Sequence, residues 1–273
     1  ESEKMEGCII FGISSYEDLF KLCYLSQSAA GILLLLKKFE YANLSADLET
    51  NIESIDFGEW LSQETTFRVR CRKCGEEDSP TPEIERKVGE LIISSIQEKS
   101  HYNQKVDLEN PEITIYVYLA GNECCIGIDF AGFDLSKRPY KIFSDSSSIK
   151  GTLAYFLVRL SSYSKKDALL DCLAGSGVVP IEAALFALGF PVNFYNKEKF
   201  AFTKIGKFAN CDFKAFFAKI DSKIKKSGSL SVYSADPNMK YVQFAKKNSK
   251  IAGVDKKLNF SRMDIEWLDT KFK

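Results

Sequence analysis

Apolar and polar positions recur along the first half of the chain with spacings that predict its secondary structure. Period-two alternation over residues 66–72 predicts a strand, and an apolar stripe at helical spacing predicts a helix over residues 82–96. Residues 113–119 and 124–130 flank Gly121-Asn122 and predict a β-hairpin. The apolar face of the first strand holds Phe67, Val69 and Cys71, and its other face holds Arg68, Arg70 and Arg72.

The residues before this region predict a smaller α+β unit. We expect a strand over residues 8–14 and a helix from Tyr16 to about Ser28. Residues 32–39 are apolar but of ambiguous type, because a short apolar run fits either a strand or a buried helix.

A different pattern fills the last hundred residues, where short apolar runs alternate with helical stretches. Strands are predicted at 168–170, 231–235 and 258–264, with helices starting near Ile181 and Tyr241. This order is typical of an open parallel sheet, whose ligands bind at the carboxyl ends of the strands. The acids that close the three strands, and that we therefore expect at that edge, are Asp171, Asp236 and Asp264.

The turn after the first of these strands contains Gly175 and Gly177, which let the backbone approach a ligand. Free N–H groups at the start of the following helix favour an anionic or polar ligand. A dinucleotide site fits poorly, because Pro180 stands at the third glycine position and Asp236 lies about 60 positions further on, not about 20. A purely structural turn is the simpler alternative.

The stretch from Asp171 to Ala184, Asp-Cys-Leu-Ala-Gly-Ser-Gly-Val-Val-Pro-Ile-Glu-Ala-Ala, resembles the first S-adenosylmethionine motif of THUMP-containing RNA guanine-N2 methyltransferases. It departs from the usual motif at Cys172, Ala174 and Val178. Ala235-Asp236 with the run 245–254 resembles the second motif of that family, and Met263-Asp264 resembles the third.

The resemblance implies that S-adenosylmethionine is the cofactor and assigns residues to its three parts. The residues implied for the methionine part are Asp171, Gly175, Ser176 and Gly177. Asp236 is implied for the ribose, and Asp264 with Ile265 for the adenine. Further cofactor-binding residues, not assigned to one part, are Cys172, Ala174 and Pro237.

Residues 50–141 resemble a THUMP domain, which implies RNA binding. The cations that we expect to contact phosphate are Arg68, Arg70, Arg72, Lys137, Arg138 and Lys141. Two alternatives stay open: the arginines on the strand could form a solvated sheet face, and residues 135–141 could be a plain charged linker.

The expected fold is therefore α/β and α+β. We predict a partial ferredoxin-like region over residues 1–49, a THUMP domain over 50–141, and the first half of a Rossmann-like class I methyltransferase domain over 142–273. In the resembled family an Asn- or Asp-Pro-Pro-aromatic loop holds the target base, but this sequence contains no Pro-Pro pair. We expect the catalytic residues beyond Lys273, and the chain to be a fragment or half of a split enzyme.

Composition narrows the class of protein. Lys+Arg and Asp+Glu both number 37, so any nucleic-acid surface must be a local patch. The longest apolar run, residues 29–36, is shorter than the ~20 residues of a bilayer span, and the first residues do not form a signal peptide. The eight cysteines have no framework spacing, and Cys71-Arg72-Lys73-Cys74 is the only CxxC. We expect a cytoplasmic protein without a metal site.

The leading hypothesis is an S-adenosylmethionine-dependent methyltransferase that forms N2-methylguanosine in tRNA, with ribosomal RNA the less favoured substrate. A second chain could supply the catalytic half. The alternatives are a non-catalytic RNA-binding subunit and a nucleotide-dependent oxidoreductase, which the missing third glycine disfavours.

Overall fold

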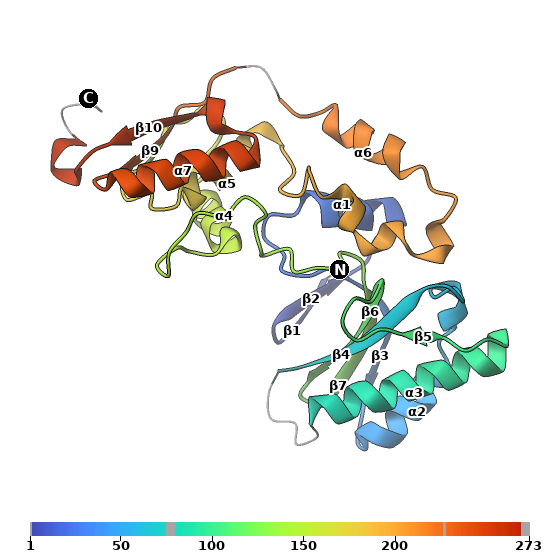
Figure 1. Ribbon diagram of the computed structural model, residues 1–273. Helices are drawn as coiled ribbons and strands as arrows, with labels where there is room; N and C mark the ends of the chain where they lie inside the picture. Colours follow the sequence, from blue (N-terminus) through green and yellow to red (C-terminus); the bar gives the residue numbers. More distant parts are fainter. Residues whose placement is uncertain (1, 75–79, 226–227, 269–273) are drawn as a thin grey trace. The chain divides into compact units, whose positions relative to one another are not determined.

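The computed structural model describes residues 2–74, 80–225 and 228–268, and the chain divides into two compact units (Figure 1). The first unit contains residues 1–23, 31–133 and 198–212, and the second contains residues 24–30, 134–197 and 213–273. Residues 24–30 thus belong to the second unit although they lie between two segments of the first along the chain. Conversely, residues 198–212 belong to the first unit although segments of the second precede and follow them. The last five residues of the predicted C-terminal domain lie outside the described part of the chain.

A five-stranded mixed sheet forms the centre of the first unit, in the order β3-β7-β6-β4-β5. Its strands are β3 (Leu33–Glu40), β4 (Thr66–Cys74), β5 (Lys105–Val106), β6 (Ile113–Ala120) and β7 (Glu123–Asp129). β4 runs parallel to β5 and β6, whereas β7 is antiparallel to both β6 and β3. The helices α2 (Leu44–Glu53) and α3 (Thr81–Ser100) pack beside each other and cover one face of this sheet (Figure 1).

β4 confirms the alternation predicted from the sequence. Phe67 and Val69 are buried on the helix side, whereas Arg70 and Arg72 are exposed. Successive side chains of a strand point to opposite faces, so Arg68, Arg70 and Arg72 lie on the face away from α3. We call these three residues the arginine row.

The N-terminal region differs from the separate unit that the sequence predicted over residues 1–49. β1 (Ser2–Met5) and β2 (Cys8–Phe11) form a hairpin, followed by α1 (Tyr16–Leu25). The ambiguous apolar run is strand β3, which pairs with β7 and is therefore part of the five-stranded sheet. Its type could not be read locally, because the pairing partner lies about ninety residues further along the chain.

Residues 198–212 complete the first unit with aromatic side chains. The ring of Phe20 packs against those of Phe130, Phe202 and Phe208, with centroids 4.8–6.1 Å apart. The Phe202 amide also donates a hydrogen bond to the Phe130 carbonyl (3.1 Å). Short 3-10 helices of this unit cover Phe57–Glu59, Ala201–Thr203 and Gly206–Phe208, and another covers Lys197–Lys199 where the chain passes between units.

The second unit is built on a three-stranded parallel sheet in the order β10-β9-β8. Its strands are β8 (Leu169–Asp171), β9 (Val232–Asp236) and β10 (Leu258–Arg262). Its helices are α4 (Gly151–Leu160), α5 (Val178–Leu188), α6 (Phe213–Asp221) and α7 (Met239–Ala252), with 3-10 helices at Asp255–Lys257 and Ile265–Trp267. α5 is buried over nearly its whole length, which explains its lack of a polar face.

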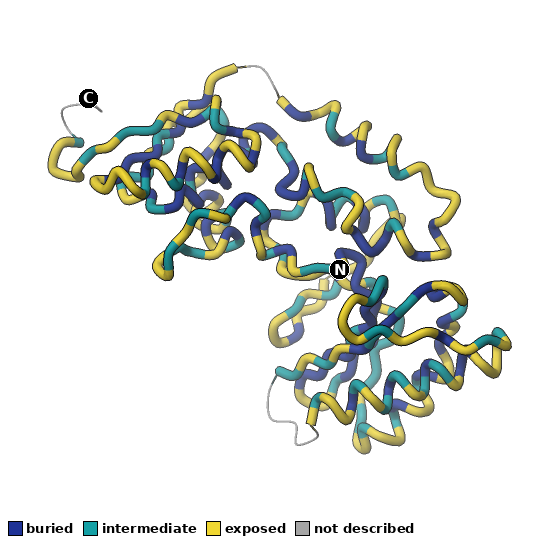
Figure 2. Tube along the Cα trace, viewed as in Figure 1, coloured by how far each residue is buried: buried dark blue, intermediate teal, exposed yellow. Residues whose placement is uncertain are grey.

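Two helices of this unit present very different outer faces. α7 buries Val242, Ala245 and Asn248, and it exposes Gln243, Lys246 and Lys247 between them (Figure 2). α4 instead buries Ala154 and Val158, while its large apolar side chains are 45–66% exposed. These exposed side chains are Leu153, Phe156, Leu157 and Leu160.

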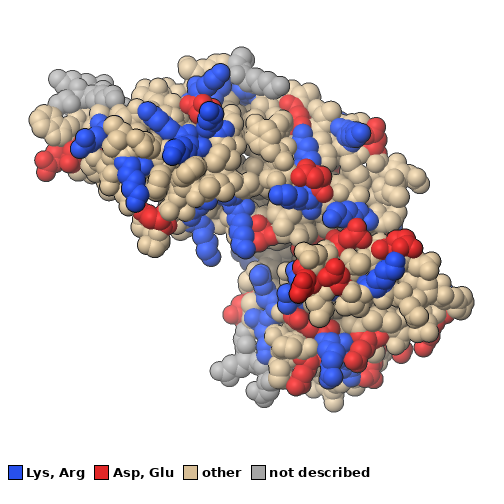
Figure 3. Space-filling model, in the orientation of Figure 1, with Lys and Arg blue, Asp and Glu red and all other residues tan. Residues whose placement is uncertain are grey.

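Basic and acidic side chains are intermixed over most of the face seen in Figure 3. Several lysines of the first unit form ion pairs, for example Lys38 with Glu123 (2.5 Å) and Lys207 with Glu59 (2.5 Å).

Candidate functional site

The turn between β8 and α5 contains two glycines with different roles. Both have positive φ, +52° for Gly175 and +80° for Gly177, a conformation that favours glycine. A Cβ on Gly175 would meet nothing within 4 Å, whereas one on Gly177 would lie 2.7 Å from the Cβ of Ala245. Gly175 therefore faces open space that a ligand could enter, and Gly177 lets α7 pack directly against the turn.

Asp236 anchors this turn through one carboxylate oxygen and binds the start of its own following segment through the other. Oδ2 accepts a hydrogen bond from the Gly175 amide (3.0 Å), and Oδ1 accepts one from the Asn238 amide (2.8 Å). The residue is only 6% exposed. Each carboxylate oxygen can accept a second hydrogen bond, so Asp236 can hold the turn and still accept from a ligand hydroxyl.

Asp171 ends β8 at the level of Ser234 in the neighbouring strand. Its Oδ1 accepts a hydrogen bond from the Leu173 amide (3.2 Å). Burial raises the pKa of the Asp171 carboxyl above its ordinary value, and the negative charge of Asp236 raises it further. The structure thus brings two of the three predicted acids close enough to interact.

The sequence analysis did not identify the residues that bind Ser176 of the turn from α7 and from the loop before α4. Asn248 is fully buried on α7, and its amide nitrogen donates to the carbonyls of Ser176 (2.9 Å) and Phe143 (2.8 Å). Its amide oxygen accepts from the Phe143 N–H (3.0 Å), and Ser148 forms a hydrogen bond with the Ser176 hydroxyl. A polar residue at a core-facing helical position is the one signal that could have identified Asn248.

The third predicted acid lies apart from this pair. Asp264 is exposed and caps the last 3-10 helix, accepting a hydrogen bond from the Glu266 amide (3.4 Å). It contributes to an open depression of about 490 Å³ at the carboxyl ends of β9 and β10. The depression is lined by Pro237, Arg262, Met263, Asp264 and Trp267. Of these, Arg262, Met263 and Trp267 were not predicted as cofactor-binding residues.

The remaining predicted residues flank these two features. Cys172 is half-buried, and the amide of the buried Ala174 donates to the Ala235 carbonyl (3.0 Å), which ties the turn to the end of β9. Ile265 is 51% exposed beside Asp264. The edge therefore combines open space at Gly175, a carboxylate with spare acceptor capacity, and a depression lined by both apolar and charged side chains. These features fit a ligand with a polar chain, a diol and a planar base.

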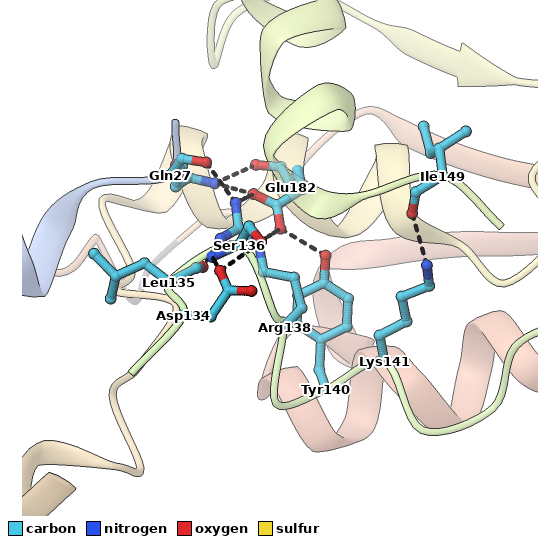
Figure 4. Close-up of polar contacts among 9 residues, drawn as sticks. All are labelled: Gln27, Asp134, Leu135, Ser136, Arg138, Tyr140, Lys141, Ile149 and Glu182. Atoms are coloured by element: carbon cyan, nitrogen blue, oxygen red, sulfur yellow. Dashed lines mark hydrogen bonds and ion pairs between the residues drawn. The ribbon is translucent and has the colours of Figure 1, made fainter. Parts of the chain in front are cut away.

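Arg138, a predicted phosphate contact, is instead a buried structural residue (Figure 4). Its guanidinium Nε lies 2.7 Å from Oε1 of Glu182, and neither side chain is exposed. Glu182 also accepts hydrogen bonds from Tyr140 (2.6 Å) and from Gln27 (2.7 Å). The prediction that Arg138 contacts RNA is wrong, because the acid 44 positions away holds its charge inside the unit.

The two lysines beside Arg138 also differ. The Lys141 ammonium donates to the Ile149 carbonyl (2.8 Å; Figure 4) and to the Ser148 carbonyl (3.0 Å). It therefore stabilises the loop before α4, and its contact with phosphate stays a prediction. Lys137 is exposed.

The arginine row lies in the first unit. Arg68 is half-buried and donates to the Leu108 carbonyl (3.1 Å), while Arg70 lies 3.6 Å from a Glu85 oxygen and keeps 47% of its side chain exposed. Arg72 is exposed and forms no ion pair with the described residues. The two outer arginines are thus open to a ligand.

Two sequence families match these units. The RMKL-like methyltransferase domain matches residues 138–273, and the THUMP domain matches residues 45–129. The chain therefore contains a THUMP domain and an RMKL-like methyltransferase domain, the combination that the motifs indicated.

Similar proteins are named as RNA methyltransferases. The chain is 31% identical over 255 residues to the tRNA (guanine(6)-N2)-methyltransferase of Methanocaldococcus jannaschii, covering 92% of this chain and 66% of the relative. It is 26% identical to the enzyme of the same name from Archaeoglobus fulgidus, covering 89% of this chain and 58% of the relative. The chain thus spans about two thirds or less of the length of these relatives.

Solved structures support the fold. A predicted N6-adenine-specific DNA methylase from Listeria monocytogenes superposes with a TM-score of 0.81 at 19% identity, over 94% of this chain and 66% of that one. A possible methylase from Clostridium difficile superposes with a TM-score of 0.80 at 23% identity, over the same shares of the two chains. The predicted combination of a THUMP domain with a Rossmann-like methyltransferase fold is confirmed.

Two negative findings hold for residues 2–74, 80–225 and 228–268. No helix in these ranges is both long and apolar enough to cross a bilayer. No three His, Cys, Asp or Glu side chains in them gather as ligands for a metal ion.

Proposed function

We propose that this chain supplies the cofactor site and the RNA-binding domain of an S-adenosylmethionine-dependent methyltransferase that forms N2-methylguanosine in tRNA. The observation that carries the proposal is the turn at Gly175, open on its ligand side and held by the Asp236 carboxylate. Two relatives that span most of the chain are named for this reaction.

Each part of the cofactor has a counterpart at the edge of the parallel sheet. The backbone around Gly175 and Ser176 would hold the methionine part, and the spare acceptor capacity of Asp236 would bind the ribose diol. The depression at Asp264 and Trp267 would take the adenine, whose amino group can donate to the carboxylate and whose ring can pack on the indole. The bound cofactor supplies an activated methyl group, and the protein contributes mainly proximity and orientation.

The THUMP domain would bind the RNA through the exposed end of the arginine row. Arg70 and Arg72 lie two residues apart on one sheet face, about 7 Å along the strand, a distance suited to successive phosphates. Tyr116 is the register partner of Arg70 on that face and is half-buried, so part of its ring is available for stacking on a base.

The acceptor base would be held by a segment that is not among these 273 residues. The chain has no Pro-Pro pair, and its named relatives are longer. Within the described residues, β8 has a neighbouring strand only on its β9 side, and α4 exposes a large apolar face. Further strands and helices would cover both. These features equally support the alternative, a cofactor- and RNA-binding half that works with a second chain.

Calorimetric titration with S-adenosylmethionine tests the cofactor site. We expect Asp236→Ala to weaken binding by on the order of 30–100-fold, about 2–3 kcal/mol, because it removes the charged hydrogen bond that holds the turn at Gly175 and the acceptor proposed for the ribose diol. Asp255→Ala is the matched control, since Asp255 lies at the amino end of β10, on the opposite edge of the sheet.

Equal affinity in the wild type and in Asp236→Ala, with the fold intact by circular dichroism, would contradict the assignment. The same titration with NAD addresses the oxidoreductase alternative. Tighter binding of NAD than of S-adenosylmethionine would favour that alternative.

A further inference from the structure

The outer face of α7 is strongly basic. Lys246, Lys247 and Lys250 on this helix and Lys256 just after it are all exposed, and we call them the basic stripe. The α7 sequence, Met-Lys-Tyr-Val-Gln-Phe-Ala-Lys-Lys-Asn-Ser-Lys-Ile-Ala, contains no acidic residue. Figure 3 shows several Lys and Arg side chains gathered over the region of α7.

Ion pairs among the described residues do not neutralise the charges of the stripe. Lys21, Lys38 and Lys87 each lie within hydrogen-bonding range of a carboxylate, and Lys197 pairs with Asp221 in the same unit as the stripe. Within residues 2–74, 80–225 and 228–268, no ion pair includes a residue of the stripe. In a protein with zero net charge, this is a local excess of positive charge.

The fold does not require these lysines. α7 packs through its opposite face, where Val242, Ala245 and Asn248 are buried against the turn and the sheet. Lys246 and Lys250 lie one helical turn apart, so their charges repel each other and disfavour the isolated helix. The C-terminal position of Lys250 benefits from the helix dipole, but Lys246 and Lys247 lie further from the helix end.

Aromatic rings beneath the stripe orient two of its side chains. The Lys247 ammonium lies 4.7 Å from the centroid of the Phe143 ring, and the Lys246 ammonium lies 5.9 Å from that of Phe260. Such contacts restrict the lysine stems while the charged ends face solvent. The ammonium groups are therefore partly ordered before any partner binds.

We propose that the basic stripe docks the phosphate backbone of the RNA substrate on the methyltransferase unit, in addition to the arginine row on the THUMP unit. The inference rests on the proposed RNA methylation. Exposed lysines without paired acids are suited to phosphates, since binding releases the counterions of the nucleic acid. Lys246 and Lys250 lie about 6 Å apart along the helix axis, close to the separation of neighbouring phosphates in a single strand.

The test is the affinity of the full chain for unmodified tRNA transcript, measured by fluorescence anisotropy at several salt concentrations. The variant carries Lys246→Glu, Lys247→Glu and Lys250→Glu. The matched control carries Lys214→Glu, Lys223→Glu and Lys225→Glu, which change the net charge equally at exposed positions of the same unit. S-adenosylmethionine binding checks that both variants keep the fold of the cofactor site.

We expect the stripe variant to bind tRNA at least tenfold more weakly, with the slope of log Kd against log salt reduced by about 2–3. The control should lose less than threefold. Equal affinities of the wild type and the stripe variant would overturn the inference and leave RNA binding through the THUMP unit in place. If the control weakened as much as the stripe variant, the effect would be one of net charge and the inference would fail. Absence of tRNA binding by the wild type would overturn the proposed function and this inference with it.

Discussion

Two groups of cations that are alike in sequence have opposite positions in the structure. Arg138 lies between two lysines in a segment that could have been a charged linker, yet none of its side chain is exposed. Arg70 lies in the arginine row of β4 and keeps 47% of its side chain exposed. The comparison shows that local cation density does not reveal whether a charge stabilises the fold or faces a ligand.

The difference comes from the acid that each cation meets. Glu182 lies inside α5, where every hydrogen-bonding group must find a partner, and it receives donors from Arg138, Tyr140 and Gln27. Glu85, the acid nearest Arg70, lies at 3.6 Å and is itself partly exposed, so water competes for both charges.

The largest expected effect comes from breaking the buried pair. We predict that Arg138→Ala lowers the free energy of unfolding by about 3–5 kcal/mol, because it leaves the Glu182 carboxylate buried without its counter-charge. Chemical denaturation followed by tryptophan fluorescence and circular dichroism measures this change. Lys137→Ala is the control on the neighbouring exposed residue and should change stability by less than about 0.5 kcal/mol.

A double variant separates charge from packing at the same site. Arg138→Met with Glu182→Met replaces the ion pair by apolar groups of similar length, and it should be more stable than Arg138→Ala alone. If Arg138→Ala were as stable as the wild type, the buried network would not hold the second unit together.

An intermediate effect is expected at Asp129, which ends β7 near the inner end of the arginine row. Burial raises the pKa of its carboxyl to about 6, against the lowering effects of the Gly132 and Ala131 amides and of Arg68. The folded state therefore binds this proton more tightly than the unfolded state between about pH 4 and 6. The contribution of Asp129 to the free energy of unfolding should therefore increase by about 1 kcal/mol when the pH falls from 7 to 5.

Thermal unfolding at matched ionic strength from pH 5 to pH 7 measures this contribution. Asp129→Asn keeps the shape of the side chain and removes the titration, so the difference in stability between the variant and the wild type should change with pH. A constant difference across this range would show that Asp129 does not titrate there.

The smallest effect on stability is expected at the exposed end of the arginine row. We predict that Arg70→Ala and Arg72→Ala each change the free energy of unfolding by less than about 0.5 kcal/mol, since exposed charges contribute little to folding. The same variants should weaken tRNA binding several-fold and almost uniformly across RNA sequences, as loss of a phosphate contact does. A large loss of stability with unchanged RNA affinity would reverse the comparison and make this row a structural feature.

Most regular elements could be predicted because their signals are local. The alternation in β4, the hairpin of β6 and β7, and the three strands ending near Asp171, Asp236 and Asp264 are all found close to their predicted positions. The strand over Leu33–Glu40 remained ambiguous, and the exposure of the apolar face of α4 was not foreseen. The secondary structure of the first segment and the exposure of the second both depend on which distant segment packs against them.

The sequence by itself determined the class of protein, since the order of strand, glycine turn and acid encodes a fold and its ligand edge through short-range patterns. Only the tertiary structure decided which distant polar groups bind one another in the interior. It joined Asn248 to Ser176 across 72 positions and Arg138 to Glu182 across 44. Such partners meet only after the helices pack, because burial leaves each polar group no alternative to the few donors and acceptors nearby.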